Sequence, residues 1–155
     1  MNEKFHTRRE LSRFFISMVF VSFALNWIWE MLQMPSYKEM AGRPLQVMAA
    51  RCSFASLGDV AIIFSIYAVG ALAAARLGWG LRARWNVYST IALLGAMNAF
   101  WIERAAITSG RWTYNDTMPV IPLLNVGLWP VLQLAALAPF VVWLSSGFAS
   151  YKREH

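Results

Sequence analysis

The stretch FFISMVFVSFALNWIWEMLQMPSY, residues 14–37, decides the class of this protein. Its first part, residues 14–32, is apolar over the length of about 20 residues that a helix needs to cross a bilayer. Three further apolar stretches of similar length follow along the 155-residue chain. The sequence therefore predicts a single, all-α, integral membrane domain over residues 1–155, an up-down-up-down four-helix bundle with spans at about 14–32, 54–77, 87–107 and 120–144.

The composition supports this class. Hydrophobic residues make up 58% of the chain and charged residues 14%, whereas soluble domains average about 45–50% and about 25%. A single cysteine, Cys52, excludes a disulfide framework and a cysteine-rich metal site. The two histidines, His6 and His155, stand near the chain ends. We therefore expect no metal centre, no cofactor and no histidine catalysis in the core.

Basic residues are distributed unequally between the two sides of the predicted bundle. The side with both termini holds nine Lys and Arg, against five on the other side. Because short cytoplasmic loops are rich in Lys and Arg, we predict a multi-pass protein of the cytoplasmic (inner) membrane with both termini in the cytoplasm. The formal net charge of +6 then belongs to that face and indicates contact with anionic lipids rather than with nucleic acid.

Polar residues that are costly in a bilayer gather at the outer end of every predicted span. Glu30 ends the first span, Asp59 lies near the start of the second, Glu103 near the end of the third and Asn125 near the start of the fourth. Up-down connections would bring these residues to one level. Because carboxylates inside a membrane usually mark function, we predict an acid/base cluster of Glu30, Asp59 and Glu103.

Helical periodicity predicts that this cluster faces inward. At about 100° per residue, Asn26, Glu30 and Gln33 share a face with Ser22. On the third span, Ala92, Ala96 and Ala99 form a small-residue stripe that ends at Glu103 and suits close helix packing. The fourth span carries Asn125 and Trp129 on one face and Gln133 deeper, and we expect Pro130 and Pro139 to interrupt it.

The loop before the fourth span has an unusual composition. Residues 110–122 read GRWTYNDTMPVIP, in which Trp112 and Tyr114 alternate with polar residues. Alternation of this kind favours an extended segment, which we expect to cover the outer end of the bundle. The predicted ligand-contacting residues are Asn26, Gln33, Trp112, Tyr114, Asn125, Trp129 and Gln133.

A purely structural alternative remains open for the acids. The outer side carries equal numbers of acidic and basic residues, so the three carboxylates could pair with Arg51, Arg104 and Arg111 and seal the helix ends. In that case the Glu103→Gln change lowers stability. In the functional case the fold survives this change while activity or ligand retention is lost.

Several motifs resemble known proteins. The pattern N26-x-x-WE-x-x-Q-x-P-x-Y37, then Gly58-Asp59, then the block from Glu103 to Pro119 and Pro130-x-x-Gln133, resembles a group of small bacterial four-span membrane proteins that carries no established activity. The block from Glu103 through Trp112 and Tyr114 is also similar to membrane carotenoid hydratases and small lycopene cyclases. That resemblance implies an acid role for Glu103 and a polyene lipid as substrate.

Two functional hypotheses follow from these patterns. In the first, the outer site binds an isoprenoid or carotenoid-like lipid, or acts on it by acid–base chemistry. Glu103 would be the proton donor and Asp59 or Glu30 its partner. In the second, the protein is a non-catalytic accessory subunit of a larger photosynthetic or respiratory membrane complex and packs on partner helices or pigments. Whether the protein is an enzyme is left open. An inward cavity favours the first hypothesis, and a closed ion-pair network favours the second.

Overall fold

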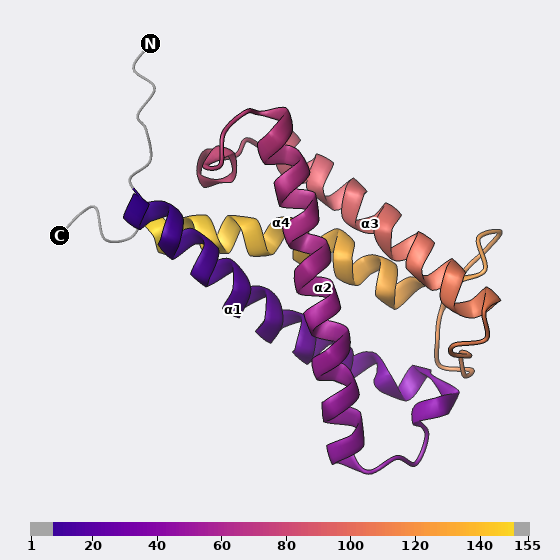
Figure 1. Ribbon diagram of the computed structural model, residues 1–155. Helices are drawn as coiled ribbons and strands as arrows, with labels where there is room; N and C mark the ends of the chain where they lie inside the picture. Colours follow the sequence, from indigo (N-terminus) through magenta and orange to yellow (C-terminus); the bar gives the residue numbers. More distant parts are fainter. Residues whose placement is uncertain (1–7, 151–155) are drawn as a thin grey trace.

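The computed structural model describes residues 8–150, which are mostly helical (Figure 1). The terminal charges that entered the orientation prediction, such as Lys4 and Lys152, and both histidines lie outside these residues. The main elements are α1 (Arg8–Gln33), α2 (Leu45–Ala73), α3 (Trp85–Thr108) and α4 (Leu128–Ser150). Short elements connect them: the 3-10 helices η1 (Met34–Ser36), η2 (Lys38–Met40) and η3 (Trp79–Arg82), and the strands β1 (Val120–Ile121) and β2 (Val126–Gly127).

Three of the four long helices are long and apolar enough to cross a membrane: α1 extended through Ser36, α2 and α4. With 24 residues α3 has sufficient length, but it is less apolar because it includes Asn86, Asn98, Glu103 and Arg104. The structure thus supports a helical membrane protein. That α3 also crosses the membrane remains a prediction.

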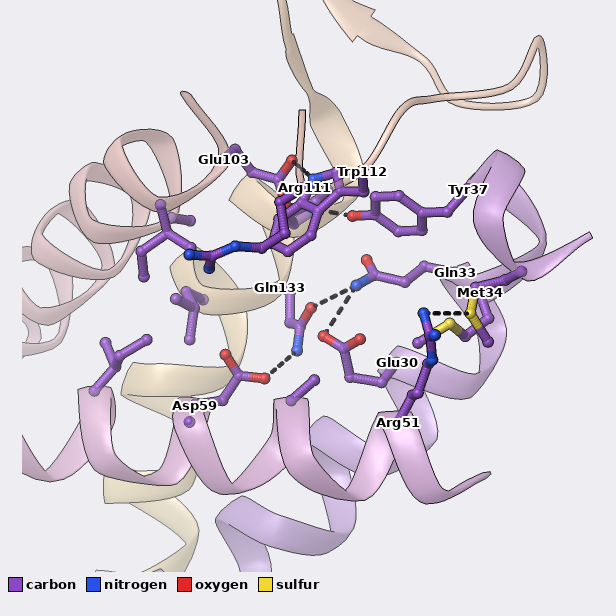
Figure 2. A pocket seen from close by; sticks show the side chains of 18 of the residues that line it. Glu30, Gln33, Met34, Tyr37, Arg51, Asp59, Glu103, Arg111, Trp112 and Gln133 are labelled. Atoms are coloured by element: carbon purple, nitrogen blue, oxygen red, sulfur yellow. Dashed lines mark hydrogen bonds between the residues drawn. The ribbon is translucent and has the colours of Figure 1, made fainter. Parts of the chain in front are cut away.

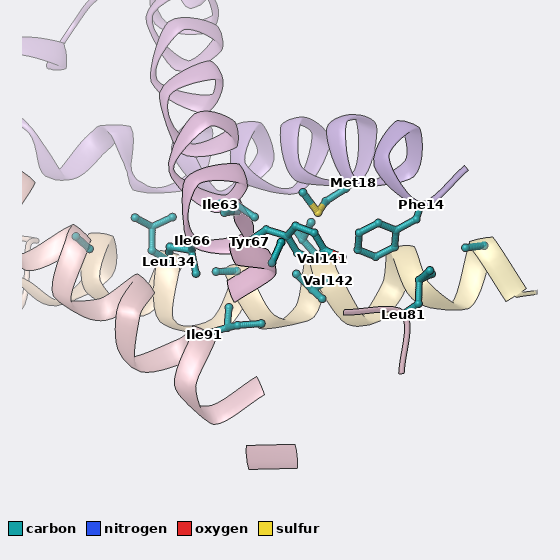
Figure 3. Packing of buried hydrophobic residues seen from close by; sticks show 14 residues of the cluster. Phe14, Met18, Ile63, Ile66, Tyr67, Leu81, Ile91, Leu134, Val141 and Val142 are labelled. Atoms are coloured by element: carbon teal, nitrogen blue, oxygen red, sulfur yellow. The ribbon is translucent and has the colours of Figure 1, made fainter. Parts of the chain in front are cut away.

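The helices pack around α4. Helix α4 lies between α1 and α3 and runs antiparallel to both (Figure 1). Helix α2 packs mainly on α1 and crosses α1 and α4 steeply instead of running beside them (Figures 1 and 3). A regular up-down-up-down bundle is therefore not confirmed. The steep crossing of α2 leaves space between its first half and the second half of α3, where the candidate site lies.

Small residues let α3 and α4 approach closely. The buried residues of α3 include Ile91, Gly95, Ala99 and Glu103. A Cβ atom on Gly95 would lie only 2.4 Å from the carbonyl oxygen of Leu134 in α4. The expected stripe is therefore present but displaced, because Gly95 makes the closest approach while Ala92 and Ala96 are half-buried.

The opposite half of the molecule has an apolar core. Phe14 and Met18 of α1 meet Ile63 and Tyr67 of α2, while α4 contributes Val141 and Val142 (Figure 3). The ring of Tyr67 stacks on Trp79 of η3 at 5.0 Å between centroids, and its hydroxyl donates to the Leu77 carbonyl at 2.6 Å. These contacts hold the α2–α3 connection against the core.

Two helices begin elsewhere than predicted. Helix α2 starts at Leu45, so Asp59 lies in its middle instead of near its start. Helix α4 starts at Leu128, and residues 120–127 form an antiparallel hairpin that pairs Val120 with Gly127. Pro122 interrupts any helix there, and Leu123 and Asn125 adopt φ values of 70° and 54°, which helices exclude. Pro130 consequently sits in the first turn of α4, where proline is tolerated, and only Pro139 is inside the helix.

Candidate functional site

A pocket of about 460 Å³ lies where the four helices meet the connections α1–α2 and α3–α4 (Figure 2). This volume is in the range of small-molecule sites. One wall is the face of α2 that carries Ala55, Gly58, Asp59 and Ile62, and the opposite wall is α3 at Ala99, Ile102 and Glu103. The remaining lining residues are Glu30, Gln33, Met34, Tyr37, Glu39, Met40, Arg51, Arg111, Trp112, Pro130, Gln133 and Leu134.

Helix α1 presents a buried polar face toward this pocket. Ser22, Asn26, Glu30 and Gln33 are all less than 10% exposed, and Ser22 and Asn26 are fully buried. Their spacing of three to four residues puts them on one side of the helix. The predicted polar face of the first span is therefore confirmed.

An amide network connects three helices at the centre of the pocket. Gln133 of α4 lies between Asp59 and Gln33 (Figure 2). Its Nε2 donates to Asp59 Oδ2 at 2.9 Å and to Asn26 Oδ1 at 3.0 Å. Gln33 Nε2 donates to Gln133 Oε1 at 3.2 Å and to Glu30 Oε1 at 3.0 Å. Two carboxylates from different helices thus share one chain of hydrogen bonds.

Glu103 occupies a different environment, since three donors surround its carboxylate. Tyr37 donates to Oε1 at 3.3 Å, Trp112 Nε1 donates to Oε2 at 3.2 Å, and the Tyr114 hydroxyl also donates to Oε2. Tyr114 in turn accepts a hydrogen bond from the backbone N–H of Gly127 at 2.7 Å. Glu103 therefore fastens the loop between α3 and α4 to the helix ends.

The two outer loops are joined to each other above the pocket. Tyr37 and Tyr114 form an isolated β-bridge, and the Glu39 carboxylate accepts two hydrogen bonds of 2.8 Å from the backbone and hydroxyl of Thr113. Burial and the nearby Glu103 carboxylate raise the pKa of Tyr37. Burial and the hydrogen bond to Glu103 likewise raise the pKa of Tyr114. Both hydroxyls therefore stay protonated and act as donors at neutral pH.

No arginine neutralises the acids of the pocket. Within residues 8–150, neither Glu30, Asp59 nor Glu103 forms an ion pair with a basic side chain. Arg51 is exposed and its guanidinium contacts Met40 Sδ at 3.7 Å, while Arg111 is exposed and lies over the Trp112 ring at 5.8 Å. The predicted sealing of the helix ends by these arginines is not found in the described part of the chain.

The structure brings together eight of the ten predicted site residues and separates two from them. The eight that line the pocket or bond into its networks are Asn26, Glu30, Gln33, Asp59, Glu103, Trp112, Tyr114 and Gln133. Asn125 is exposed in the turn of the β1–β2 hairpin, and Trp129 is 38% exposed on the first turn of α4. Neither residue lines the pocket, and the helical turn predicted around Asn125 is absent because α4 begins only at Leu128.

Sequence reasoning missed two contributors. Tyr37 donates to Glu103 although the two are 66 positions apart in sequence, and its signal was its place two residues after Pro35 in a motif that contains Glu30. Gly58 lines the pocket beside Asp59 and leaves open space where a Cβ would stand. In residues 8–150, no group of three His, Cys, Asp or Glu side chains is arranged to hold a metal ion.

Comparison with known proteins identified no relative of this chain. No family model, no curated protein and no solved structure matches this chain.

Proposed function

We propose that this protein is a four-span protein of the bacterial cytoplasmic membrane that binds an isoprenoid- or carotenoid-like lipid in the pocket at its outer end. The observation that carries the proposal is the cavity of about 460 Å³, lined by the carboxylates of Glu30, Glu39, Asp59 and Glu103, none of which forms an ion pair with an arginine or lysine of the described residues. Carboxylates removed from water are energetically costly, so the placement of Glu30, Asp59 and Glu103 in this site favours the binding of a ligand or of a proton.

A lipid would enter this pocket sideways from the bilayer. The two facing walls, on α2 and α3, are largely apolar and carry Ala55, Ile62, Ala99 and Ile102. Gly58 is an exposed residue of the α2 wall. A Cβ at this position would meet no atom within 4 Å, so the α2 wall is open there. An apolar chain between the helices and a polar head among the acids is the arrangement that this lining favours.

The acid–base part of the proposal assigns different roles to the three carboxylates. Asp59 accepts a hydrogen bond on Oδ2, and its Oδ1 accepts none from the described residues, while Glu30 accepts hydrogen bonds from the amides of Gln33 and Gln133. Both oxygens of Glu103 are occupied by donors. We therefore assign proton exchange with a bound lipid to Asp59 and Glu30, and positioning of the Trp112–Tyr114 loop to Glu103, which differs from the role that the sequence suggested.

The alternative, an accessory subunit of a larger complex, would be favoured by a closed ion-pair network at the helix ends. Because the pocket is open and its acids are unpaired among residues 8–150, we place lipid binding first.

The test compares two glycine substitutions. Gly58→Phe puts a large ring into the pocket wall, whereas Gly147→Phe puts the same ring at an equally open position of α4 outside the pocket. Protein purified gently from its own membrane is measured by native mass spectrometry, and its lipids are identified. We expect an isoprenoid-type lipid on the parent and on Gly147→Phe, and its loss from Gly58→Phe. Equal retention by all three proteins, or a parent without such a lipid, would refute the proposal.

A further inference from the structure

We infer that the pocket selects a head group that donates hydrogen bonds and carries no negative charge, such as a hydroxyl or an ammonium group. The inference rests on the proposed lipid site and adds the chemistry of its ligand. It comes from the direction of the hydrogen bonds around the cavity.

Both ends of the amide network have a fixed direction. At one end, Trp29 Nε1, which can only donate, bonds to Gln33 Oε1 at 3.2 Å. At the other end, Asn26 Nδ2 bonds to the backbone carbonyl of Ser22, which can only accept, at 2.8 Å. The two ends therefore fix how the amides of Gln33 and Gln133 are turned. Reversing the Gln33 amide would bring its NH₂ group against the Trp29 N–H, and reversing the Gln133 amide would bring its NH₂ group against that of Gln33.

With the amides turned this way, the hydrogen-bond donors of the glutamines in the pocket are all bonded within the protein. The two N–H groups of Gln33 go to Glu30 and Gln133, and those of Gln133 go to Asn26 and Asp59. Tyr37 and Trp112 donate to Glu103. Apart from Arg51 and Arg111, every side chain of the lining that has an N–H or O–H group has therefore bonded it.

Apart from the two arginines, the polar atoms of the cavity that still lack a hydrogen-bond partner are therefore acceptors. Asp59 Oδ1 receives no donor from residues 8–150, and the buried Glu39 Oε2 in the lining has no hydrogen-bond partner among them either, so a ligand that supplies a donor gains a hydrogen bond to a carboxylate. A carboxylate or phosphate head would meet these oxygens as like charges. It could contact only the two arginines, which are exposed and lie on opposite sides of the pocket beside Met34 and Trp112 (Figure 2).

A matched series of probes tests the selectivity. The full-length protein in lipid nanodiscs is titrated with geranylgeranylamine, geranylgeraniol and geranylgeranoic acid, which share one chain, and bound molecules are counted by native mass spectrometry. We expect the amine and the alcohol to bind at least about tenfold more tightly than the acid, as one buried hydrogen bond to a charged group implies. Binding of the acid as tight as that of the alcohol would overturn the inference.

A single isosteric substitution should reverse the preference. In Asp59→Asn, the amide oxygen must face Gln133 Nε2, so the new NH₂ group points into the cavity. The acid should then gain affinity relative to the amine. Asp116→Asn removes the same charge from an exposed position outside the pocket and should leave the order unchanged. Glu39→Gln, whose amide oxygen must face the Thr113 N–H and hydroxyl, offers the same reversal at Oε2 if Asp59→Asn fails to fold. An order unchanged from the parent would overturn the inference.

Failure of the inference can be told from failure of the lipid site itself. If all three probes bind and Gly58→Phe abolishes their binding, but the acid binds best, the lipid site exists and only the inferred preference for hydrogen-bond donors (the donor rule) is wrong. If Gly58→Phe leaves the binding of every probe unchanged, the lipid site is wrong and the donor rule falls with it.

Discussion

At the scale of single residues, Gln133 has the largest structural role among the polar side chains of the pocket. It is 2% exposed and bonds to Asn26, Gln33 and Asp59, which come from two other helices. A buried amide with several partners is costly to remove because each partner loses its bond in a site that excludes water. Gln133 thereby couples the positions of α1, α2 and α4.

Replacing Gln133 by Leu should lower the free energy of unfolding by about 1–3 kcal/mol, because buried partners are left without hydrogen bonds. Denaturant unfolding in detergent micelles measures the change. Gln46→Leu, on the exposed first turn of α2, is the control and should unfold like the parent. Equal stability of the two variants would show that the network contributes little.

Glu103→Gln should loosen the loop between α3 and α4. A glutamine can keep the donors of Trp112 and Tyr114 on its oxygen only by turning its NH₂ group to the Tyr37 hydroxyl, which must then accept instead of donate, and the neutral amide oxygen binds these donors more weakly than the carboxylate. Trypsin cleavage after the exposed Arg111 should become several-fold faster. Asp116→Asn removes a charge from the same loop without touching these donors, so its cleavage rate is expected to match the parent. An unchanged rate in Glu103→Gln would contradict the fastening role.

At the scale of elements, the approach of α3 to α4 depends on one position. Gly95 faces the backbone of Leu134, so the two helices touch there through main-chain atoms. Close backbone contact of this kind is a common basis of helix association in membranes. In lipid the hydrophobic effect does not drive helices together, so van der Waals packing has to do so. The pocket depends on it because Glu103 lies about two turns further along the same face of α3.

Gly95→Ala should therefore destabilise the protein by about 1–3 kcal/mol, since its new methyl group would overlap the Leu134 carbonyl. Gly147→Ala makes the same change in α4 where the Cβ meets no atom within 4 Å, and there the better helix propensity of Ala should leave stability equal or higher. Thermal unfolding in micelles compares the two. A Gly95→Ala protein as stable as Gly147→Ala would mean that α3 and α4 lie further apart.

At the scale of the whole molecule, charge and pocket lie at opposite ends of the proposed membrane protein. Among residues 8–150, six arginines and the single acid Glu10 lie at the start of α1 or around the α2–α3 connection, while Glu30 and Glu103 lie near the other ends of α1 and α3. The six are Arg8, Arg9, Arg13, Arg76, Arg82 and Arg84. From the positive-inside rule we predict that the pocket lies near the outer leaflet.

Reporter fusions test this orientation. A reporter that is active only outside the cytoplasm should be silent when fused after His155 and active when inserted at Gly42, an exposed residue of the connection between η2 and α2. The unequal number of Lys and Arg on the two sides is the physical reason. The opposite pattern would reverse the orientation and move the proposed site to the cytoplasmic leaflet.

Much of the local structure could be read from the amino-acid sequence, because it depends on residues close together in the chain. Apolar length predicted the helices, and the predicted third span, 87–107, nearly matches α3 at Trp85–Thr108. The spacing of Asn26, Glu30 and Gln33 predicted the buried polar face of α1. Propensity and periodicity act over a few turns, so they need no knowledge of the fold.

The arrangement of the site was decided by tertiary contacts. The crossing of α2, the choice of Gly95 over Ala96 at the α3–α4 contact and the hairpin that holds Asn125 all depend on how separate elements pack. The roles of the acids depend on partners far away in sequence: Gln133 and Asp59 are 74 residues apart, and Tyr37 and Glu103 are 66 apart. A hydrogen bond takes its direction from both of its partners, so the pattern that separates Glu103 from Asp59 and Glu30 exists only once the helices have met.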